Sequence, residues 1–146
     1  MNDKVFLVQT DTTAGFLSKS SDRLANIKKR PEGKPFLVAT SSFQRLKRLV
    51  RVPKKHRKKV RKSDKTTFIY RDIDAIRVVK NGRHHNFLER FGDFYSSSAN
   101  ISGDRFNLEK VTEISDLICE DKRGFFESGS SQIIKLGKIK RRRLRR

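Results

Sequence analysis

Two cationic side chains, Lys28 and Arg30, stand one residue apart at the start of a turn. The turn covers residues 30–35 and contains Pro31 and Pro35, and proline restricts both its own backbone and that of the preceding residue. Lysine offers a compact point charge, whereas arginine offers a planar fork that fits phosphate or carboxylate. Two cations in this rigid frame predict a site for a polyphosphate. The alternative interpretation is that both are solvated surface cations of a basic protein.

A loop rich in small polar side chains occupies residues 96–103, Ser-Ser-Ser-Ala-Asn-Ile-Ser-Gly. Its hydroxyls, its amide and its backbone N–H groups could bind an anion or a sugar, although an ordinary Ser/Asn turn has the same composition. If Ser98 and Asn100 share a ligand with Lys28 and Arg30, the loop and the cationic turn must face each other across one cleft.

Threonines follow the first apolar run of the chain. Thr10 and Thr12 come directly after residues 5–8, which we expect to form a strand, and ligands in α/β sheets bind at strand ends. A pair of hydroxyls can hold the hydroxyl and carboxylate of an amino acid. The alternative role for these threonines is to cap the end of the strand.

A metal site built from protein ligands and a reactive thiol are not expected. His84 and His85 are adjacent and so point apart, and no cysteine or carboxylate lies at a matching spacing. Cys119 is the only cysteine, which excludes an internal disulfide, and its apolar neighbours favour a buried structural thiol. Because the sequence also lacks a Gly-rich phosphate-binding loop, the cationic and polar groups above would have to hold any nucleotide.

The charge is strongly positive. Lys and Arg number 36 against 16 Asp and Glu, which gives a net charge of +20. Such a charge favours an anionic partner, with nucleic acid as the first candidate. Basic residues crowd the chain at 51–65 and at 138–146, and the first run supplies candidate contacts to an RNA backbone: Lys54, Lys55, Arg57, Lys58, Lys59 and Arg61. The alternative is charge that serves only solubility.

The order of apolar runs, capping residues and turns predicts an α/β fold with one twisted, mixed β-sheet flanked by helices. Strands are expected at 5–8, 36–39, 66–70, 75–79, 94–95, 116–119 and 132–136, and helices after Ser20 or Ser21, after Ser41 or Ser42, around 87–91 and after Asn107. The basic stretch 51–65 is expected to be a solvated helix or a mobile segment. We assign one domain to residues 1–137 and a basic tail to residues 138–146.

No window of the sequence approaches the 18 uninterrupted apolar residues of a membrane-spanning helix, and the apolar run near Met1 is too short for a signal peptide. We therefore expect a cytoplasmic protein without a membrane partner.

Four segments together resemble the YrdC-like family. They are residues 9–15 (Gln-Thr-Asp-Thr-Thr-Ala-Gly), residues 27–31 with the trailing Lys34-Pro35, residues 97–103 (Ser-Ser-Ala-Asn-Ile-Ser-Gly) and residues 130–134 (Ser-Ser-Gln-Ile-Ile). The family has similar motifs, Pro-Thr-Asp-Thr, Lys-x-Arg-Pro, Thr-Ser-Ala-Asn-x-Ser-Gly and a Ser-Thr pair before two apolar residues, in the same order. Each motif alone is common, but their shared order over most of the chain is specific.

The resemblance implies a threonylcarbamoyl-AMP synthase. Such enzymes combine L-threonine, bicarbonate and ATP, with Mg²⁺ bridging the phosphates, and partner proteins use the product to modify tRNA. Carried over by position, the resemblance implies that Lys28 and Arg30 are catalytic and hold the phosphates, and that Thr10 and Thr12 hold the threonine. It places the nucleotide against Lys28, Arg30, Ser98, Asn100, Ser131 and one arginine among Arg141, Arg142 and Arg143, with Arg143 as the candidate.

The sequence also departs from the family pattern. Gln9 replaces a proline, Ala14 an aromatic residue and Leu17 a glycine, while Lys135 stands where aspartate is frequent. A second hypothesis is therefore a non-catalytic module of the same fold that binds double-stranded RNA or tRNA. A third is carbamoyl transfer to another acceptor, as in related modules of hydrogenase maturation proteins.

Overall fold

Strand β1 (Val5–Gln9) is buried on both faces, and this places helices on both sides of the sheet. Val5 and Leu7 pack against one group of buried residues and Phe6 and Val8 against another, as the two-residue period of a strand requires. In this computed structural model, which describes residues 2–31, 34–138 and 140–145, helices α1 (Ser21–Lys28) and α5 (Leu108–Ile114) contribute to the first group, and α4 (Gly82–Phe91) contributes to the second.

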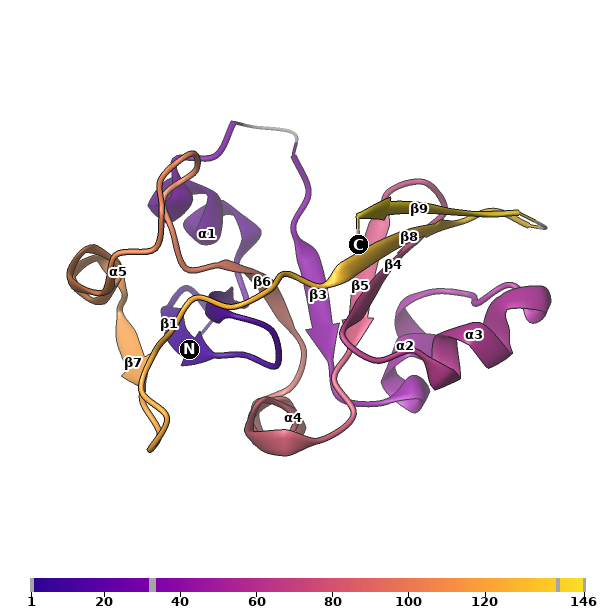
Figure 1. Cartoon of the computed structure of the whole chain (residues 1–146), viewed down its shortest axis with the longest axis horizontal. Helices are drawn as coiled ribbons and strands as arrows, with labels where there is room; N and C mark the ends of the chain where they lie inside the picture. The colour runs from indigo at the N-terminus through magenta and orange to yellow at the C-terminus, as the bar shows by residue number, and fades with distance from the viewer. Residues whose placement is uncertain (1, 32–33, 139, 146) are drawn as a thin grey trace.

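The strands form one mixed sheet, which confirms the predicted fold class (Figure 1). Its order is β7-β1-β2-β6-β3-β5-β4-β8-β9, and β1–β7, β3–β5 and β4–β8 are its parallel pairs. The remaining strands are β2 (Ala14–Ser18), β3 (Leu37–Thr40), β4 (Thr66–Tyr70), β5 (Asp74–Val78), β6 (Phe94–Ser98), β7 (Leu117–Cys119), β8 (Gln132–Leu136) and β9 (Arg141–Arg145).

Helix boundaries follow from side chains that cap the backbone. Ser20 accepts a hydrogen bond from the Arg23 N–H and begins α1, and Ser42 accepts from the Arg45 N–H and begins α2 (Phe43–Leu49). Lys29 ends α1 in the left-handed conformation, with φ of 52°. Both predicted helix starts are confirmed.

The side chains of strands β4 and β5 alternate between a buried cluster on one face of the sheet and a cavity on the other. Phe68 and Ile76 face a buried cluster that also contains Leu46 of α2. Thr67 and Arg77 alternate with them and therefore face the opposite side of the sheet, where they line a cavity.

The basic stretch 51–65 folds as a short 3₁₀ turn, η1 (Lys54–His56), followed by α3 (Arg57–Lys62). Val60 is buried in the cluster under α2, and the His56 Nε2 atom lies 2.9 Å from the Gly137 carbonyl oxygen. Of the two alternatives predicted for this stretch, the structure shows the solvated helix. Two buried side chains, Val60 and His56, hold it on the sheet.

Two strands were not predicted. Strand β2 contains no β-branched residue, yet it pairs with both β1 and β6 in the middle of one half of the sheet. Strand β9 lies in the segment predicted as a basic tail and pairs antiparallel with β8. Residues 139 and 146 of that segment, and Glu32 and Gly33 of the cationic turn, lie outside the described residues.

Within the part of the chain that the structure describes, no helix is long and apolar enough to cross a bilayer.

The packing of α4 on the sheet can be tested at Leu88, which is fully buried. Leu88→Ala is expected to lower the free energy of unfolding by about 2–5 kcal/mol, because it removes buried methyl groups and leaves a cavity. Leu108→Ala, at a leucine that is 47% exposed on α5, is the matched control and should change it by less than about 0.5 kcal/mol. Urea unfolding followed by circular dichroism measures both, and equal losses would contradict this packing.

Candidate functional site

Lys28 joins the cationic turn to the hydroxyl-rich loop. Its Nζ atom donates hydrogen bonds to the Ser98 carbonyl oxygen at 2.8 Å and to the Asn100 Oδ1 at 2.9 Å. The Ser102 N–H donates to the Lys28 carbonyl oxygen at 2.9 Å, so the backbones are tied as well. Lys28 is only 4% exposed. The turn and the loop are therefore in direct contact. Of the four residues predicted to share a ligand, Arg30 and Ser98 line the cavity described below, and Lys28 and Asn100 do not.

The buried position changes the proton affinity of this amine. Burial, and secondarily the positive charge of Arg30, lowers the pKa of Lys28 to about 8. The ammonium is thus still the main form at pH 7 but loses its charge just above physiological pH.

A cavity of about 550 Å³ lies beside this link, over the face of the sheet that carries Thr67 and Arg77. Arg30 stands on its wall, where its Nη2 donates to the Pro35 carbonyl oxygen at 3.2 Å and its guanidinium lies 4.6 Å from the Phe36 ring centroid. The polar and cationic lining consists of Thr10, Thr12, Thr13, Arg30, Lys34, Thr67, Asp72, Arg77, Ser96, Ser97, Ser98, Ser130, Ser131 and Arg145. Such a lining suits a ligand with several negative charges and several hydroxyl or amide groups.

The predicted threonine pair lines the same cavity. The Thr10 hydroxyl donates to the Thr13 carbonyl oxygen at 2.6 Å and accepts from the Thr12 N–H at 3.2 Å, which folds the segment into a tight turn. Gly15 is required beside it, because a Cβ there would lie 2.7 Å from the Thr10 Cγ2 and 3.1 Å from the Ser97 carbonyl oxygen.

Residues 125–128 close against this threonine turn. The Phe126 N–H donates to the Gln9 Oε1 at 3.0 Å, and the Ser128 N–H donates to the Thr13 Oγ1 at 2.9 Å. Gln9, one of the departures from the family pattern, is therefore a buried side chain that holds a neighbouring segment in place.

A buried ionic cluster supports the cavity and was not predicted as part of the site. Arg77 Nη2 lies 3.0 Å from the Asp11 Oδ1, and His84 Nδ1 lies 3.1 Å from the same oxygen. Burial raises the pKa of Asp11, but the His84 hydrogen bond and the Arg77 charge outweigh burial and lower it. Burial also lowers the pKa of His84, which favours the neutral ring. The sequence signal for Arg77 was a lone cation between Ile76 and Val78 in an apolar strand.

The C-terminal strand brings a different arginine to the cavity than the one predicted. Arg145 Nε donates to the Ser131 carbonyl oxygen at 2.9 Å, and Ser131 Oγ lies 2.8 Å from the Thr67 Oγ1. Arg143 is exposed and does not line the cavity. Because of a register shift at Ile133/Ile134, Arg145 lies opposite the cavity-lining Ile133, whereas Arg143 pairs with Ile134.

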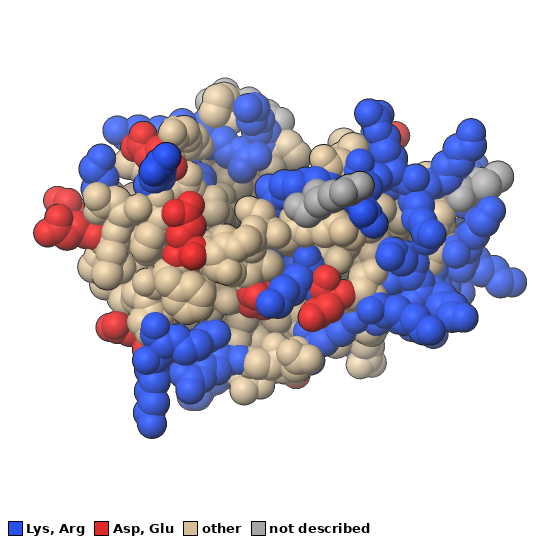
Figure 2. All heavy atoms as spheres, viewed as in Figure 1, with Lys and Arg blue, Asp and Glu red and all other residues tan. Residues whose placement is uncertain are grey.

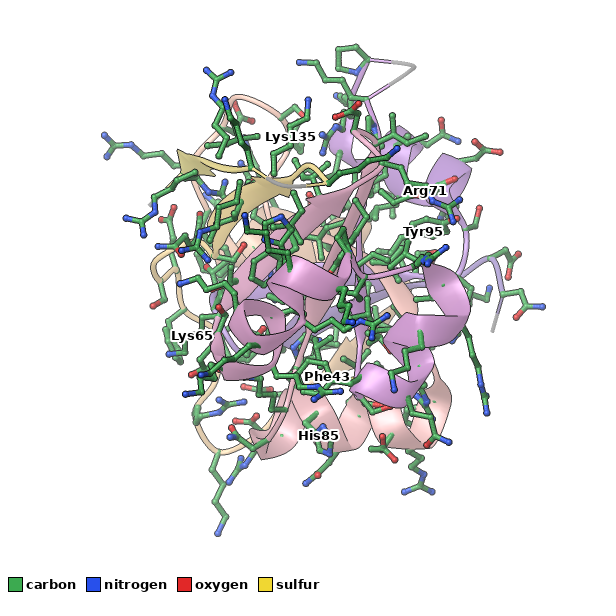
Figure 3. The ribbon with its side chains drawn as sticks, turned by 90° about the vertical axis from the view of Figure 1, so that its right-hand side faces the viewer. Phe43, Lys65, Arg71, His85, Tyr95 and Lys135 are labelled. Atoms are coloured by element: carbon green, nitrogen blue, oxygen red, sulfur yellow. The ribbon has the colours of Figure 1, made fainter. Side chains whose placement is uncertain are left out.

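The predicted RNA contacts lie away from this cavity. Lys54, Lys55, Arg57, Lys58 and Arg61 are exposed and Lys59 is half-buried, and none of the six lines the cavity. Figure 2 shows Lys and Arg gathered at the end of the molecule formed by α3, β8 and β9, whereas Asp and Glu are concentrated elsewhere. Figure 3 looks onto this end, and side chains that end in nitrogen extend outward around the ribbon.

The titration of Lys28 is a direct test of the link between turn and loop. NMR of lysine-labelled protein should show one amine with a pKa of about 8, and this signal should be absent from Lys28→Met. In the unfolded chain the Lys28 amine keeps its proton up to its ordinary pKa of 10.5, whereas in the folded protein it loses the proton at about pH 8. The free energy of unfolding should therefore rise with pH between 8 and 10.5, and it should rise less in the variant. A titration of Lys28 at its ordinary value would contradict its buried position.

Comparison with known proteins gives a consistent assignment. The Sua5/YciO/YrdC family model, described as telomere recombination, matches residues 1–146, whereas curated protein sequences gave no match. P. abyssi Sua5 complexed with L-threonine superposes with a TM-score of 0.73 at 20% identity, over 92% of this chain and 47% of that one. This chain thus spans about half the length of Sua5.

Two further structures share the fold. E. coli YciO superposes with a TM-score of 0.73 at 18% identity, over 97% of this chain and 82% of that one. HypF in a phosphate- and nucleotide-bound form gives a TM-score of 0.76 at 16% identity, over 99% of this chain and 27% of that one. With the family model extending over the whole sequence, the chain belongs to the Sua5/YciO/YrdC family.

Proposed function

We propose that the protein is an L-threonylcarbamoyl-AMP synthase that uses L-threonine, bicarbonate and ATP for threonylcarbamoyladenosine modification of tRNA. The observation that carries the proposal is the convergence of Arg30, Ser98 and the Thr10–Thr12 turn on one cavity, with Lys28 bound behind it. The fold neighbours bound to L-threonine and to phosphate and nucleotide support this ligand set.

In the proposed reaction, the threonine amine takes up the bicarbonate carbon, and water leaves to give a carbamate. A carbamate oxygen then attacks the α-phosphorus of ATP, the bond from that phosphorus to the bridging oxygen breaks, and pyrophosphate leaves. Arg30 and Arg145, which both line the cavity, would neutralise phosphate charge, whereas the charge of Arg77 is already compensated by Asp11. Lys28 would hold the loop of Ser98 and Asn100 in the geometry that the nucleotide needs.

The amino acid would bind at the threonine turn. The Thr10 hydroxyl is already used within the turn, as donor to Thr13 and acceptor from Thr12. The Thr12 hydroxyl lies 3.3 Å from the Thr10 oxygen and would donate to it. Its lone pairs are then available to accept a hydrogen bond from the hydroxyl of L-threonine.

Mg²⁺ would enter with ATP. Among the residues that the structure describes, no group of three or more His, Cys, Asp or Glu side chains could hold a metal ion, and Asp72 is the one carboxylate of the cavity lining. This lining fits a Mg²⁺ ion carried mainly by phosphate oxygens and water, as is common for ATP complexes.

The proposed activity predicts pyrophosphate release that requires threonine and bicarbonate together. Lys28→Met should lower kcat/KM roughly 100-fold, because the loop of Ser98 and Asn100 loses the side chain that holds it in position. Lys29→Gly is the matched control, since it removes the same charge one residue away and glycine readily adopts the φ of 52° found there. It should leave kcat/KM within about twofold, less than the effect of removing a single hydrogen bond.

Thermal melting must first show that both variants are folded. Pyrophosphate release that persists without threonine, or none from folded wild-type protein supplied with Mg²⁺, would overturn the synthase proposal.

A second candidate function, binding of tRNA or double-stranded RNA, is favoured by the meeting of two basic runs. Residues 54–62 and 140–145 lie far apart in sequence, yet the His56–Gly137 contact joins η1 to the end of β8, beside β9. Together the two runs form an extended positive surface for the phosphates of an RNA. Contacts to phosphates would be independent of the RNA sequence.

RNA binding at this end can be tested by its salt dependence. A variant with Lys54, Lys55 and Lys58 changed to alanine should bind duplex RNA more weakly and with a shallower dependence on salt. The slope of the logarithm of the binding constant against the logarithm of the salt concentration should decrease in magnitude by about 0.9 for each phosphate that the variant no longer neutralises. The control, with the exposed Lys4, Lys110 and Lys122 changed to alanine, has the same net charge but should keep the wild-type slope. Equal slopes in all three proteins would rule out this surface.

A further inference from the structure

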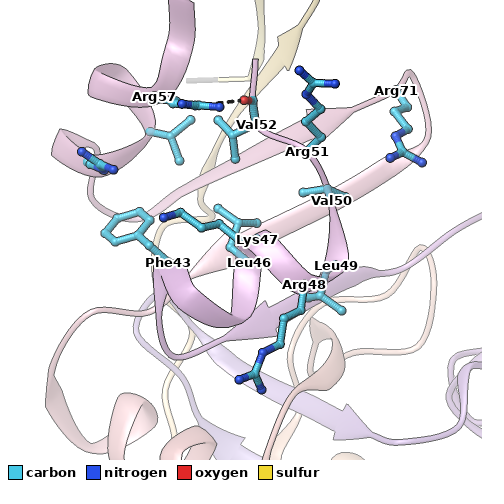
Figure 4. Close-up of a pocket in the computed structure, with 12 residues that line it drawn as sticks. Phe43, Leu46, Lys47, Arg48, Leu49, Val50, Arg51, Val52, Arg57 and Arg71 are labelled. Atoms are coloured by element: carbon cyan, nitrogen blue, oxygen red, sulfur yellow. Dashed lines mark hydrogen bonds between the residues drawn. The ribbon is translucent and has the colours of Figure 1, made fainter. Parts of the chain in front are cut away.

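A second cavity of about 490 Å³ lies between α2, α3 and the segment 50–52, and it shares no lining residue with the first (Figure 4). Leu46, Val50 and Val60, all nearly fully buried, form its floor and belong to the cluster under α2. Phe43 and Leu49 add to the wall, and Leu49 is 43% exposed. The space is within the range of small-ligand sites, and its apolar floor suits a flat, largely apolar group.

The rim of this cavity is cationic. It consists of Lys47, Arg48, Arg51, Arg57, Arg61 and Arg71, and every one of these residues is exposed. In the part of the chain that the structure describes, no acidic residue lines the cavity. Across the described ranges, none of the six forms an ion pair with a carboxylate. Their charges are therefore available to an anion.

The number and type of these cations favour a polyanion over a single anionic group. One carboxylate or phosphate would leave most of the rim uncompensated, whereas a chain of phosphates can follow it. Five of the six are arginines, whose planar groups both fork onto phosphates and stack on bases. The charge also continues past the cavity, because Arg57 and Arg61 share α3 with the exposed Lys58.

We propose that this cavity binds one unpaired base of single-stranded RNA, with the adjoining phosphates on the cationic rim. Phe43 and the aliphatic floor would contact the base, and base contacts of this kind tolerate any sequence. A base inside a duplex is stacked on both faces and cannot enter, so the cavity would distinguish unpaired from paired RNA. This inference rests on the proposed RNA contact and is independent of the proposed synthase activity.

The test uses a short oligoribonucleotide with a central 2-aminopurine, free or annealed to its complement. Binding of the single strand should change the 2-aminopurine fluorescence, and binding of the duplex should not. Leu49→Ala should weaken single-strand binding about 3- to 10-fold, because it removes apolar contact area at the mouth. It should leave duplex binding within about twofold, since phosphate contacts are unchanged.

The matched control is Leu144→Ala. Leu144 is 48% exposed on β9 among arginines and does not line the cavity, so its replacement should affect neither RNA. Phe43→Leu keeps an apolar side chain but removes the ring, and it should weaken single-strand binding about fivefold or more.

Each other outcome overturns the inference in an identifiable way. If both RNAs bind but Leu49→Ala weakens both equally, or if the fluorescence does not change, the base site is wrong and the RNA contact stands. If neither RNA binds, both the base site and the RNA contact are wrong. If Leu49→Ala abolishes sedimentation with phosphatidylcholine–phosphatidylserine vesicles and leaves single-strand binding unchanged, the cavity serves a lipid surface instead.

Discussion

The buried ammonium of Lys28 is the interaction on which the candidate active site depends. An ammonium removed from water is stable only where acceptors replace its hydration, and here the Ser98 carbonyl and the Asn100 amide do so. The bond spans about half of the chain and joins the end of α1 to the end of β6. Arg30 follows two residues later, so its position on the cavity wall is set by the same anchor. Gly15 then allows the threonine turn to approach the adjacent Ser97 backbone.

Strand β9 relates the two candidate sites to each other. In Figure 1 it runs from the basic end of the molecule back toward its middle, where the chain ends. The four arginines of β9 are all exposed, and Arg145 also contacts Ser131 at the central cavity. An RNA bound at the basic end would therefore contact the strand that supplies an arginine to the cavity, and the product of the proposed reaction would form close to its nucleic-acid acceptor.

The sequence predicted those features that depend on residues close together in the chain. The helix caps Ser20 and Ser42 and the strand at 66–70 could be predicted from neighbouring residues, whereas the pairing of Lys28 with Asn100 came from the resemblance to the family motifs. Strand β2 could not, because its burial comes from two partner strands and not from its own side chains. The sequence indicated an arginine among residues 141–143 and not Arg145, because a shift of register in β8–β9 decides which arginine reaches Ser131. The second cavity depends on the packing of α3 on α2 and has no sequence motif.

The stretch 51–65 folds although its many like charges repel one another. Like charges on one short helix repel, and each exposed pair destabilises it by a few tenths of a kcal/mol. Burial of one valine side chain contributes about 1.5–3 kcal/mol, and Val60 supplies such a contact, with His56 bonded to the Gly137 carbonyl. The anchors thus outweigh the repulsion and leave the cations pointing to solvent. A segment held in this way presents a preformed positive surface, so an anionic partner would bind it without first having to order the chain.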